Sequence, residues 1–465
     1  MSQEQGERRY RLRSLWLDGL PGPLKPRPAL PGDTECDVVI VGAGFTGLWS
    51  AYYLKQQQPD LRVVIVEREI AGYGPSGRNG GWVSAGIAGS SKVYRRTGGD
   101  DGVLRGQRET YNTVSEIGRV AAAEGIECDF LHAGAVMVAT NEPQRKRLLK
   151  FDERRRAMGV GPDDHRLLDA DELRELVRVE ECLAASFTPH TARVDPAKLA
   201  RGLADVCERM GVVIHERTEA LAIEPGVVRC AQGDVRADVV LRATEAYTIE
   251  LPHESRRFLP LYSLMIATEP LGDEVWDEIG WKDGLMVGDH RHLFFYAQRT
   301  ADGRIAIGGR GAPYRLRAPI GERHERNTEV RMRLTETVRR HFPAATGARI
   351  THHWGGPLGV PRDWSMSITY DEATGMGWAG GYSGHGVVSA NISGRTLADM
   401  VLGNESDLLS LPWVNHRSPR WEPEPLRFFA SRAIVRVLGD ADRREDTRGV
   451  PDPRLKLVAP FMPPG

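Results

Sequence analysis

A glycine-rich turn between a buried strand and a helix constrains the fold of this chain more than any other feature. Residues 36–41 (CDVVIV) form a short apolar run, which is typical of a strand buried on both faces of a parallel sheet. Gly42-Ala43-Gly44-Phe45-Thr46-Gly47 follows, and a helix is predicted over residues 45–56. Gly42 permits the turn, Gly44 lets the backbone approach a pyrophosphate, and Gly47 lets the helix pack closely on the strand. The sequence therefore predicts a dinucleotide site at a helix start.

An acidic residue ends the next strand and fits the same site. The apolar run over residues 61–66 leads into Glu67, at a distance from Gly42 that suits a carboxylate accepting the ribose hydroxyls. Arg68 follows and is predicted to lie at the cofactor as well. A carboxylate at this place disfavours a 2′-phosphate on the ribose.

Two further glycine loops favour FAD over NAD. The first is Ser76-Gly77-Arg78-Asn79-Gly80-Gly81, and the second is Gly381-Tyr382-Ser383-Gly384-His385-Gly386-Val387, which precedes a helix predicted over residues 390–402. Backbone that lies against a flat ring needs residues with little side-chain bulk. A helix start at the isoalloxazine would also stabilise the anionic reduced flavin.

These motifs together resemble the D-amino-acid-oxidase-like (DAO) superfamily of FAD enzymes, and most closely the γ-glutamylputrescine oxidoreductase-like branch. The resemblance spans roughly residues 36 to 405. It rests on VGAGFTGL, on SGRNGG after the ribose acid, on Trp354-Gly355-Gly356-Pro357-Leu358-Gly359-Val360, and on GYSGHGV. It implies oxidation of an amine to an imine by hydride transfer to flavin N5, followed by hydrolysis.

The resemblance also places individual residues. It puts Val213 near the adenine and Ala243 and Thr244 near the pyrophosphate. The predicted cofactor-binding set is therefore Gly42, Gly44, Phe45, Thr46, Gly47, Glu67, Arg68, Ser76, Gly77, Arg78, Asn79, Gly80, Gly81, Val213, Ala243, Thr244, Gly381, Tyr382, Ser383, Gly384, His385, Gly386 and Val387.

Positioning at the ring supplies most of the rate of hydride transfer, so few catalytic residues can be named from sequence. We predict Arg78, Tyr296 and His385 as catalytic. Weaker candidates above the ring are Tyr262, His292 and Gln298. No metal is expected, because His290, His292 and the pair His352-His353 lack the cysteines or carboxylates that would complete a coordination shell.

Three departures from relatives refine the expectation. Leu358 stands where the glycine-oxidase and D-amino-acid-oxidase branches have an arginine that grips the substrate carboxylate. This favours an amine, or an amino acid bound by another cation such as Arg78 or Arg310. Ala306 stands where the sarcosine-oxidase branch has a lysine that assists O₂ reduction. The identity of the electron acceptor, O₂ or another compound, therefore stays open. No cysteine follows Cys230, which predicts noncovalent FAD.

Composition excludes several classes. The 62 basic and 63 acidic residues nearly cancel, so no net field recruits nucleic acid. The five separated cysteines indicate neither a disulfide framework nor a zinc site. The first residues lack the apolar region of a secretory signal, and no stretch is long and apolar enough to span a membrane. A cytoplasmic location is expected.

We predict an α/β protein with a discontinuous Rossmann-like FAD-binding domain and an α+β substrate domain with a large antiparallel sheet. The expected division is an extended N-terminal arm (1–35), an FAD-binding domain (36–100, 190–250 and 350–405), a substrate domain (101–189 and 251–349) and a C-terminal tail (406–465). Long strands are expected over residues 259–268, 285–298 and 304–309.

Three functions are consistent with these observations. The leading prediction is an amine oxidase that uses FAD and O₂. The others are an FAD-dependent dehydrogenase with another acceptor and a flavin-binding protein without catalysis. A nicotinamide-linked reductase is disfavoured by the two additional glycine loops.

Overall fold

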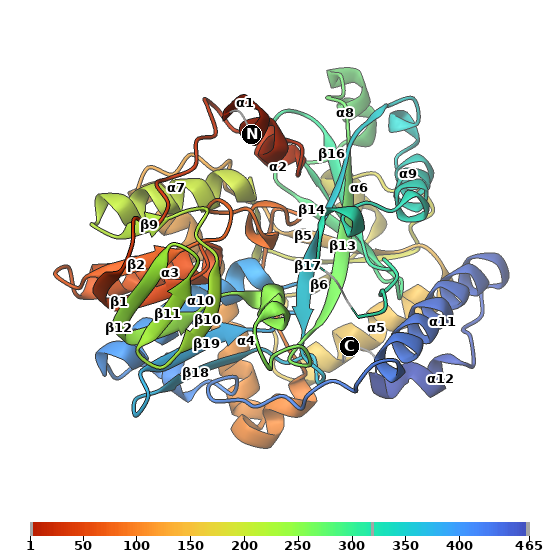
Figure 1. The fold of residues 1–465 in the computed structure, drawn as a ribbon. Coiled ribbons are helices and arrows are strands. Elements are labelled where there is room, and N and C mark those ends of the chain that lie inside the picture. The colour runs from red at the N-terminus through yellow and green to blue at the C-terminus, as the bar shows by residue number, and fades with distance from the viewer. Residues whose placement is uncertain (1–2, 318–319, 462–465) are drawn as a thin grey trace.

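The computed structural model describes residues 3–317 and 320–461. Two eight-stranded sheets lie side by side, and helices cover their outer faces (Figure 1). We call them the nucleotide sheet and the substrate sheet. No helix in the described part of the chain is long and apolar enough to cross a membrane.

The nucleotide sheet has a parallel centre in the order β9-β2-β1-β12-β19, with β10 and β11 antiparallel beyond β12 and β18 antiparallel beside β19. Its strands are β1 (Thr34–Val41), β2 (Val63–Val66), β9 (Val213–His215), β10 (Ala220–Glu224), β11 (Val227–Cys230), β12 (Gly233–Arg242), β18 (Ser367–Asp371) and β19 (Met376–Gly380). The predicted parallel sheet is confirmed.

Burial on both faces explains why β1 is a continuous apolar run. Val38 and Ile40 belong to the core shared with α3 (Phe45–Gln57), α7 (Pro196–Arg209) and α10 (Gly386–Leu402), whereas Val39 and Val41 belong to the core shared with β11. Asp195 caps α7 by accepting from the backbone N–H groups of Ala197 and Lys198, which is typical of an aspartate followed by proline at a helix start.

The substrate sheet is almost entirely antiparallel, in the order β17-β13-β16-β15-β14-β5-β7-β6, and only β14 and β5 run parallel. Its strands are β5 (Ala135–Ala139), β6 (Arg166–Leu168), β7 (Ala184–Thr188), β13 (Leu259–Thr268), β14 (Met286–Asp289), β15 (Phe295–Arg299), β16 (Ile305–Gly309) and β17 (Ile350–Val360). Its helices are α5 (Glu142–Ala157), α6 (Ala170–Leu176), α8 (Asp273–Ile279) and α9 (Thr328–His341).

A third, small sheet links the two large ones. It consists of β3 (Trp82–Ser84), β4 (Leu131–His132) and β8 (Thr191–Arg193), and β8 follows β7 and leads directly into α7. The long helix α4 (Ser91–Ala123) runs beside it, with a break at Gly99, and packs on α10.

The N-terminal segment corrects one expectation. Residues 1–35 were predicted to be extended, but α1 (Gln3–Arg11) and α2 (Leu15–Asp18) are helices. The prolines that suggested an extended arm begin only at Pro21, and residues 23–31 indeed have neither helix nor strand. Trp16 is buried on α2 and packs edge-on against Trp354.

Two strand predictions are also wrong in detail. Residues 285–298 form the hairpin β14–β15 instead of one strand, because the turn is held from outside: Asp442 accepts from the backbone N–H groups of His292 and Leu293. Strand β17, which was assigned to the FAD-binding domain, pairs along its length with β13 in the substrate sheet. The rest of the division into domains stays a prediction.

The C-terminal tail packs on the substrate sheet. Helix α11 (Leu426–Arg448) lies beside α5 and is followed by α12 (Leu455–Val458) (Figure 1). Arg147 of α5 donates to Glu445 of α11 through two nitrogens, each 2.7 Å from a carboxylate oxygen.

One buried carboxylate ties the N-terminal segment to the nucleotide sheet. Glu216 is fully buried and accepts from the backbone N–H groups of Arg27 (2.7 Å) and Ala71 (2.8 Å), and from the guanidinium groups of Arg27 (3.0 Å) and Arg201 (2.8 Å). Removing one member of such a network leaves buried charges uncompensated.

We therefore predict that Glu216→Gln lowers the free energy of unfolding by about 3 kcal/mol. Urea denaturation measures the change. Glu224→Gln, at a half-exposed carboxylate, is the control and should change stability by no more than about 0.5 kcal/mol. Equal stability of the two variants would contradict the role of Glu216.

Candidate cofactor and substrate site

A single cavity of about 600 Å³ runs from the carboxyl ends of the nucleotide strands to the substrate sheet. Its walls come from both large sheets: Val41 and Gly42 end β1, while Ala135, Ser186 and Tyr296 lie on β5, β7 and β15. Open α/β sheets bind ligands outside the carboxyl ends of their strands, so the position suits a cofactor.

The first glycine motif shapes one end of the cavity. Gly42 has φ +108°, and a Cβ there would lie 2.7 Å from the carbonyl oxygen of Ala243 on the neighbouring chain segment. Gly44 is the N-cap of α3 and supplies no side-chain acceptor to the helix start. A Cβ at Gly47 would overlap the carbonyl oxygen of Gly42, so Gly47 serves helix packing and does not line the cavity.

Glu67 stands where β2 ends and lines the cavity. Its two carboxylate oxygens accept from the backbone N–H groups of Ala43 (2.9 Å) and Glu69 (2.9 Å). Burial raises the pKa of this carboxyl. Arg68 also lines the cavity, pairs with Glu250 at 2.8 Å and stacks over the ring of Tyr247.

Val213, which was predicted to lie near the adenine, is not part of the cavity wall. It begins β9, where it pairs with Val64, is 49% exposed and does not line the cavity. The residues of this segment that line the cavity instead follow β9 in the chain: Thr218, Glu219, Ala220 and Leu221. The reason is the strand direction, since the start of a parallel strand lies away from the edge that binds ligands.

The second glycine loop bridges the two sheets. Ser76 accepts from the backbone N–H of Phe45 at the start of α3 (2.8 Å). A Cβ at Gly80 would overlap the ring of Tyr296, so the loop passes directly beneath the substrate sheet. Arg78 is almost fully buried; its guanidinium pairs with Glu325 (2.8 Å) and donates to the carbonyl oxygen of Gly355 (3.2 Å).

The third glycine loop is held by a residue that the sequence analysis missed. Glu245 lines the cavity and accepts from the backbone N–H groups of Gly381 and Tyr382, each at 3.2 Å. Burial raises the pKa of Glu245 to about 7. The hydroxyl of Tyr382 lies 2.7 Å from that of Thr46, which joins this loop to the first.

His385 follows in the same loop and is the N-cap of α10, again without a side-chain cap bond. Its Nδ1 is buried and has no hydrogen-bond partner among the described residues. Burial, and then the charge of Arg310, lower the pKa of His385 to about 4, so the imidazole is neutral at pH 7.

Most of the predicted set gathers at the cavity. Gly47, Gly77, Gly81, Val213 and Gly381 are not among its lining residues. The predicted residues that line it are Gly42, Gly44, Phe45, Thr46, Glu67, Arg68, Ser76, Arg78, Asn79, Gly80, Ala243, Thr244, Tyr296, Tyr382, Ser383, Gly384, His385, Gly386 and Val387.

Three weaker candidates lie elsewhere. The hydroxyl of Tyr262 accepts from the backbone N–H of Gly321, beside a separate small pocket. Gln298 is buried and donates to the carbonyl oxygen of Gly80. His292 lies in the β14–β15 turn, 3.1 Å from Glu445 of α11.

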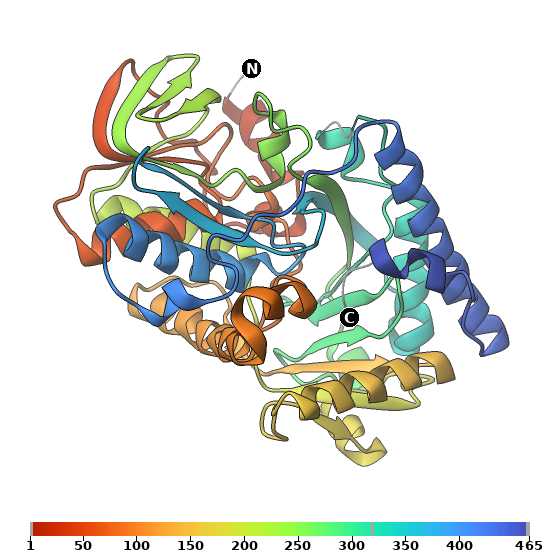
Figure 2. The same ribbon diagram turned by 90° about the horizontal axis from the view of Figure 1, so that it is seen from below.

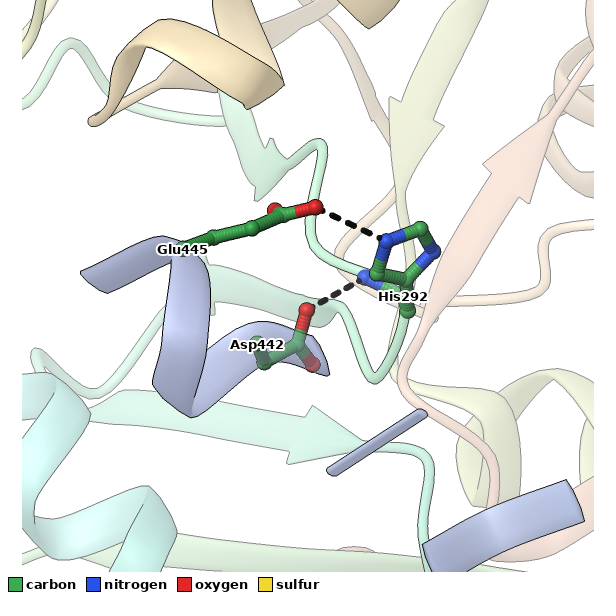
Figure 3. Close-up of side chains that lie close together, drawn as sticks. All are labelled: His292, Asp442 and Glu445. Carbon is green, nitrogen blue, oxygen red and sulfur yellow. Dashed lines mark hydrogen bonds and ion pairs between the residues drawn. The ribbon is translucent and has the colours of Figure 1, made fainter. Parts of the chain in front are cut away.

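Figure 3 shows His292 with Asp442 and Glu445, whose potential ligand atoms lie within 4.8 Å of one another. Existing contacts already use these carboxylates: Arg147 donates to both oxygens of Glu445, and two backbone N–H groups of the turn donate to Asp442. We therefore assign the cluster to docking of α11.

Arg310, which the sequence analysis names as a cation that could bind a substrate carboxylate, lies outside the glycine motifs but belongs to the site. It lines the cavity just beyond β16, and its guanidinium stacks over the rings of Phe294 (4.5 Å) and Trp364 (5.6 Å). No carboxylate of residues 3–317 or 320–461 forms an ion pair with it. Burial lowers the pKa of Arg310 to about 10, so it is charged at pH 7.

These residues fit FAD. Two helix starts without side-chain caps meet the same cavity, and both are approached by glycine backbone. Each of the five cysteines is free, and none lines the cavity, in keeping with noncovalent binding.

Comparison with known proteins decides the family. Residues 37–400 match the family model described as FAD dependent oxidoreductase (DAO). The chain belongs to this family. It is therefore an FAD-dependent oxidoreductase, as the resemblance in the sequence predicts.

Individual relatives and solved structures are similar to most of this chain. γ-Glutamylputrescine oxidoreductase of Escherichia coli is 29% identical over 385 residues, covering 82% of this chain and 86% of that protein. The probable oxidoreductase OrdL of Haemophilus influenzae is 27% identical over 397 residues with the same coverage. Glycine oxidase from Geobacillus kaustophilus superposes with a TM-score of 0.69 at 20% identity, over 83% of this chain and 100% of that one, which confirms the fold class.

We predict that Gly42→Ala raises the Kd for FAD at least tenfold, because the added methyl group meets the Ala243 carbonyl and the left-handed backbone is strained. Fluorescence titration of the apoprotein with FAD measures the affinity. Gly226→Ala is the control, since Gly226 has φ +75° in the β10–β11 hairpin away from the cavity. An equal loss of FAD affinity in both variants would show that backbone strain weakens binding generally and would contradict a specific role of Gly42.

Proposed function

We propose that the protein oxidises a primary or secondary amine, or an amino-acid derivative, to an imine that water then hydrolyses. Bound FAD supplies the hydride acceptor. The observation that carries the proposal is the meeting of His385, Tyr296 and Arg310 on a cavity continuous with the nucleotide-binding edge. Relatives named for amine and amino-acid oxidation support it.

The role of His385 follows from its neutral imidazole. Amine oxidation by hydride transfer needs an uncharged nitrogen with its α-C–H held in position. With its pKa lowered to about 4, His385 is a weak base. Its Nδ1 packs against Gly86, but the imidazole lines the cavity and can accept a hydrogen bond from the amine N–H through Nε2. We therefore propose that His385 orients the amine.

Arg310 keeps the amine uncharged. Its charge acts on both His385 and Tyr296, so an amine bound between them experiences it too. A like charge disfavours the ammonium form and lowers the pKa of the bound amine. The substrate then enters the reaction as the free amine.

We propose supporting roles for Tyr296 and Arg78 in place of the catalytic roles first predicted. The Tyr296 hydroxyl lies 2.7 Å from that of Ser263, and burial raises its pKa, so it stays protonated and fixes the wall of the cavity. Arg78 is already paired with Glu325. We propose that Arg78 holds the second glycine loop and does not contact the reacting atoms.

The arginine that grips the substrate carboxylate in the glycine-oxidase branch is replaced here by Leu358. Leu358 lines the cavity and has no group that could bind a carboxylate. We favour an amine, or an amino acid whose carboxylate is bound by Arg310, over free glycine.

The electron acceptor is proposed to be O₂, which gives H₂O₂. The alternative is a dehydrogenase that uses another acceptor, and it is favoured by Ala306, a fully buried residue without a charge to assist O₂ reduction. Stopped-flow mixing of the reduced protein with air-saturated buffer separates the two, because only an oxidase is reoxidised at the rate of turnover.

An anaerobic screen of amines tests the proposed activity. Amines are added to the purified protein, and the flavin absorbance near 450 nm, roughly the band of the oxidised cofactor, is followed. Bleaching by at least one amine is expected. If no amine reduces the flavin, the result would instead favour a flavin-binding protein without catalytic activity.

We predict that Arg310→Met moves the pH dependence of flavin reduction upward by about one unit. Without the positive charge the bound amine keeps its proton to higher pH, so the rate at neutral pH falls. Rapid-mixing measurements from pH 6 to pH 10 test this. Arg299→Met, where the arginine stacks on Trp276 away from the cavity, should leave the profile in place, and an unshifted profile in Arg310→Met would refute the role of the charge.

A further inference from the structure

One arm of the cavity extends away from the nucleotide sheet, between α4, α5 and β7. We call it the outer arm; its lining residues are Tyr111, Phe151, Arg155, His165, Ser186 and His190. Figure 2 shows α4 and α5 at neighbouring places below the two sheets. None of these residues belongs to the glycine motifs, so the cofactor accounts for none of them.

Arg155 is the charged group of the outer arm. Its Nη2 donates to the hydroxyl of Tyr111 (2.5 Å), and its guanidinium lies 5.4 Å from the centre of the Phe151 ring. Its Nε is buried and has no hydrogen-bond partner. Among the residues that the structure describes, no carboxylate forms an ion pair with Arg155, so a buried donor and a charge both lack a counterpart.

A second polar group, His165, lies beside it. His165 is 8% exposed, and its Nε2 is buried without a hydrogen-bond partner. Burial, and then the charge of Arg155, lower the pKa of His165 to about 4. The carboxylate of Asp152 lies 3.6 Å from this Nε2, so we assign the nitrogen to Asp152 and not to a ligand.

Two acids lie near the outer arm. Asp152 pairs with Arg156 through one carboxylate oxygen (2.9 Å), and its other oxygen, Oδ1, is buried without a hydrogen-bond partner 3.6 Å from Nε2 of His165. Asp164 accepts from His190 at 2.7 Å, and the His190 ring stacks on Tyr111. Neither acid neutralises Arg155.

The carboxylates that line the cavity all lie toward the nucleotide sheet. Glu67 and Glu245 accept backbone N–H groups of the first and third glycine motifs, while Glu219 and Glu250 lie near Arg68. The second ammonium group of a diamine would therefore find a guanidinium in the outer arm, and no carboxylate among the described lining residues.

We propose that the outer arm binds the carboxylate of a substrate that has an amine at one end and a carboxylate at the other, with Arg155 as its donor. The proposal rests on the proposed amine oxidation, which would take place at the Arg310 and His385 end of the cavity. The preferred substrate class is thus an ω-amino carboxylate or an amide derivative of one, in preference to a diamine of the same length.

Binding of a carboxylate that cannot react tests the site without any turnover. Isothermal titration of the FAD-loaded protein with hexanoate should give a Kd that rises at least tenfold in Arg155→Met and recovers in part in Arg155→Lys. Arg145→Met is the matched control, because Arg145 is exposed on the same helix and pairs only with Glu142. Thermal melting establishes that each variant is folded.

Turnover provides the second measurement. The ratio of kcat/KM for straight-chain ω-amino carboxylates to that for diamines of equal length should exceed one in the wild type and fall about tenfold in Arg155→Met, chiefly through KM. Absence of hexanoate binding in the wild type, binding unaffected by Arg155→Met, or a preference for diamines would each overturn the proposal. If no amine reduces the flavin, the proposed function fails, while the hexanoate titration still decides whether the outer arm binds carboxylates.

Discussion

The architecture depends on the close approach of two backbone segments where β1 and β12 end side by side. Gly42 turns the chain against the Ala243 carbonyl with no room for a side chain, and α3 begins two residues later. Because β2 is parallel to β1, Glu67 reaches the same edge. This one contact therefore brings together the backbone predicted to bind the phosphates and the carboxylate predicted to bind the ribose, at the edge where the cavity opens toward the substrate sheet.

Within that cavity, the presence or absence of an ion-pair partner distinguishes a structural arginine from arginines that can bind a ligand. Arg78 is paired with Glu325 and so stabilises the second glycine loop. Arg310 and Arg155 face the same cavity, and no carboxylate of the described residues pairs with either. A guanidinium that faces a cavity without a counter-charge is available to a ligand, so its presence at both ends of this cavity points to binding. The two charges would favour an uncharged amine at one end and an anion at the other.

The sequence predicted what local patterns determine. Strand β13 and the Asp195 cap of α7 have the bounds that their residues suggest, and the three glycine motifs meet at one cavity. The sequence analysis failed where contacts between residues distant in sequence determine the structure. The β14–β15 turn depends on Asp442, β17 depends on pairing with β13, and the outer arm depends on α5, whose charged pattern gave no sign that Arg155 faces inward.

The most direct test of this account is the amount of FAD released when the purified protein is precipitated with acid. Noncovalent binding at the carboxyl edge of the nucleotide sheet predicts about one FAD per chain in the supernatant and a colourless pellet. A yellow pellet would contradict noncovalent binding, and a colourless protein that takes up no added FAD would contradict the site itself.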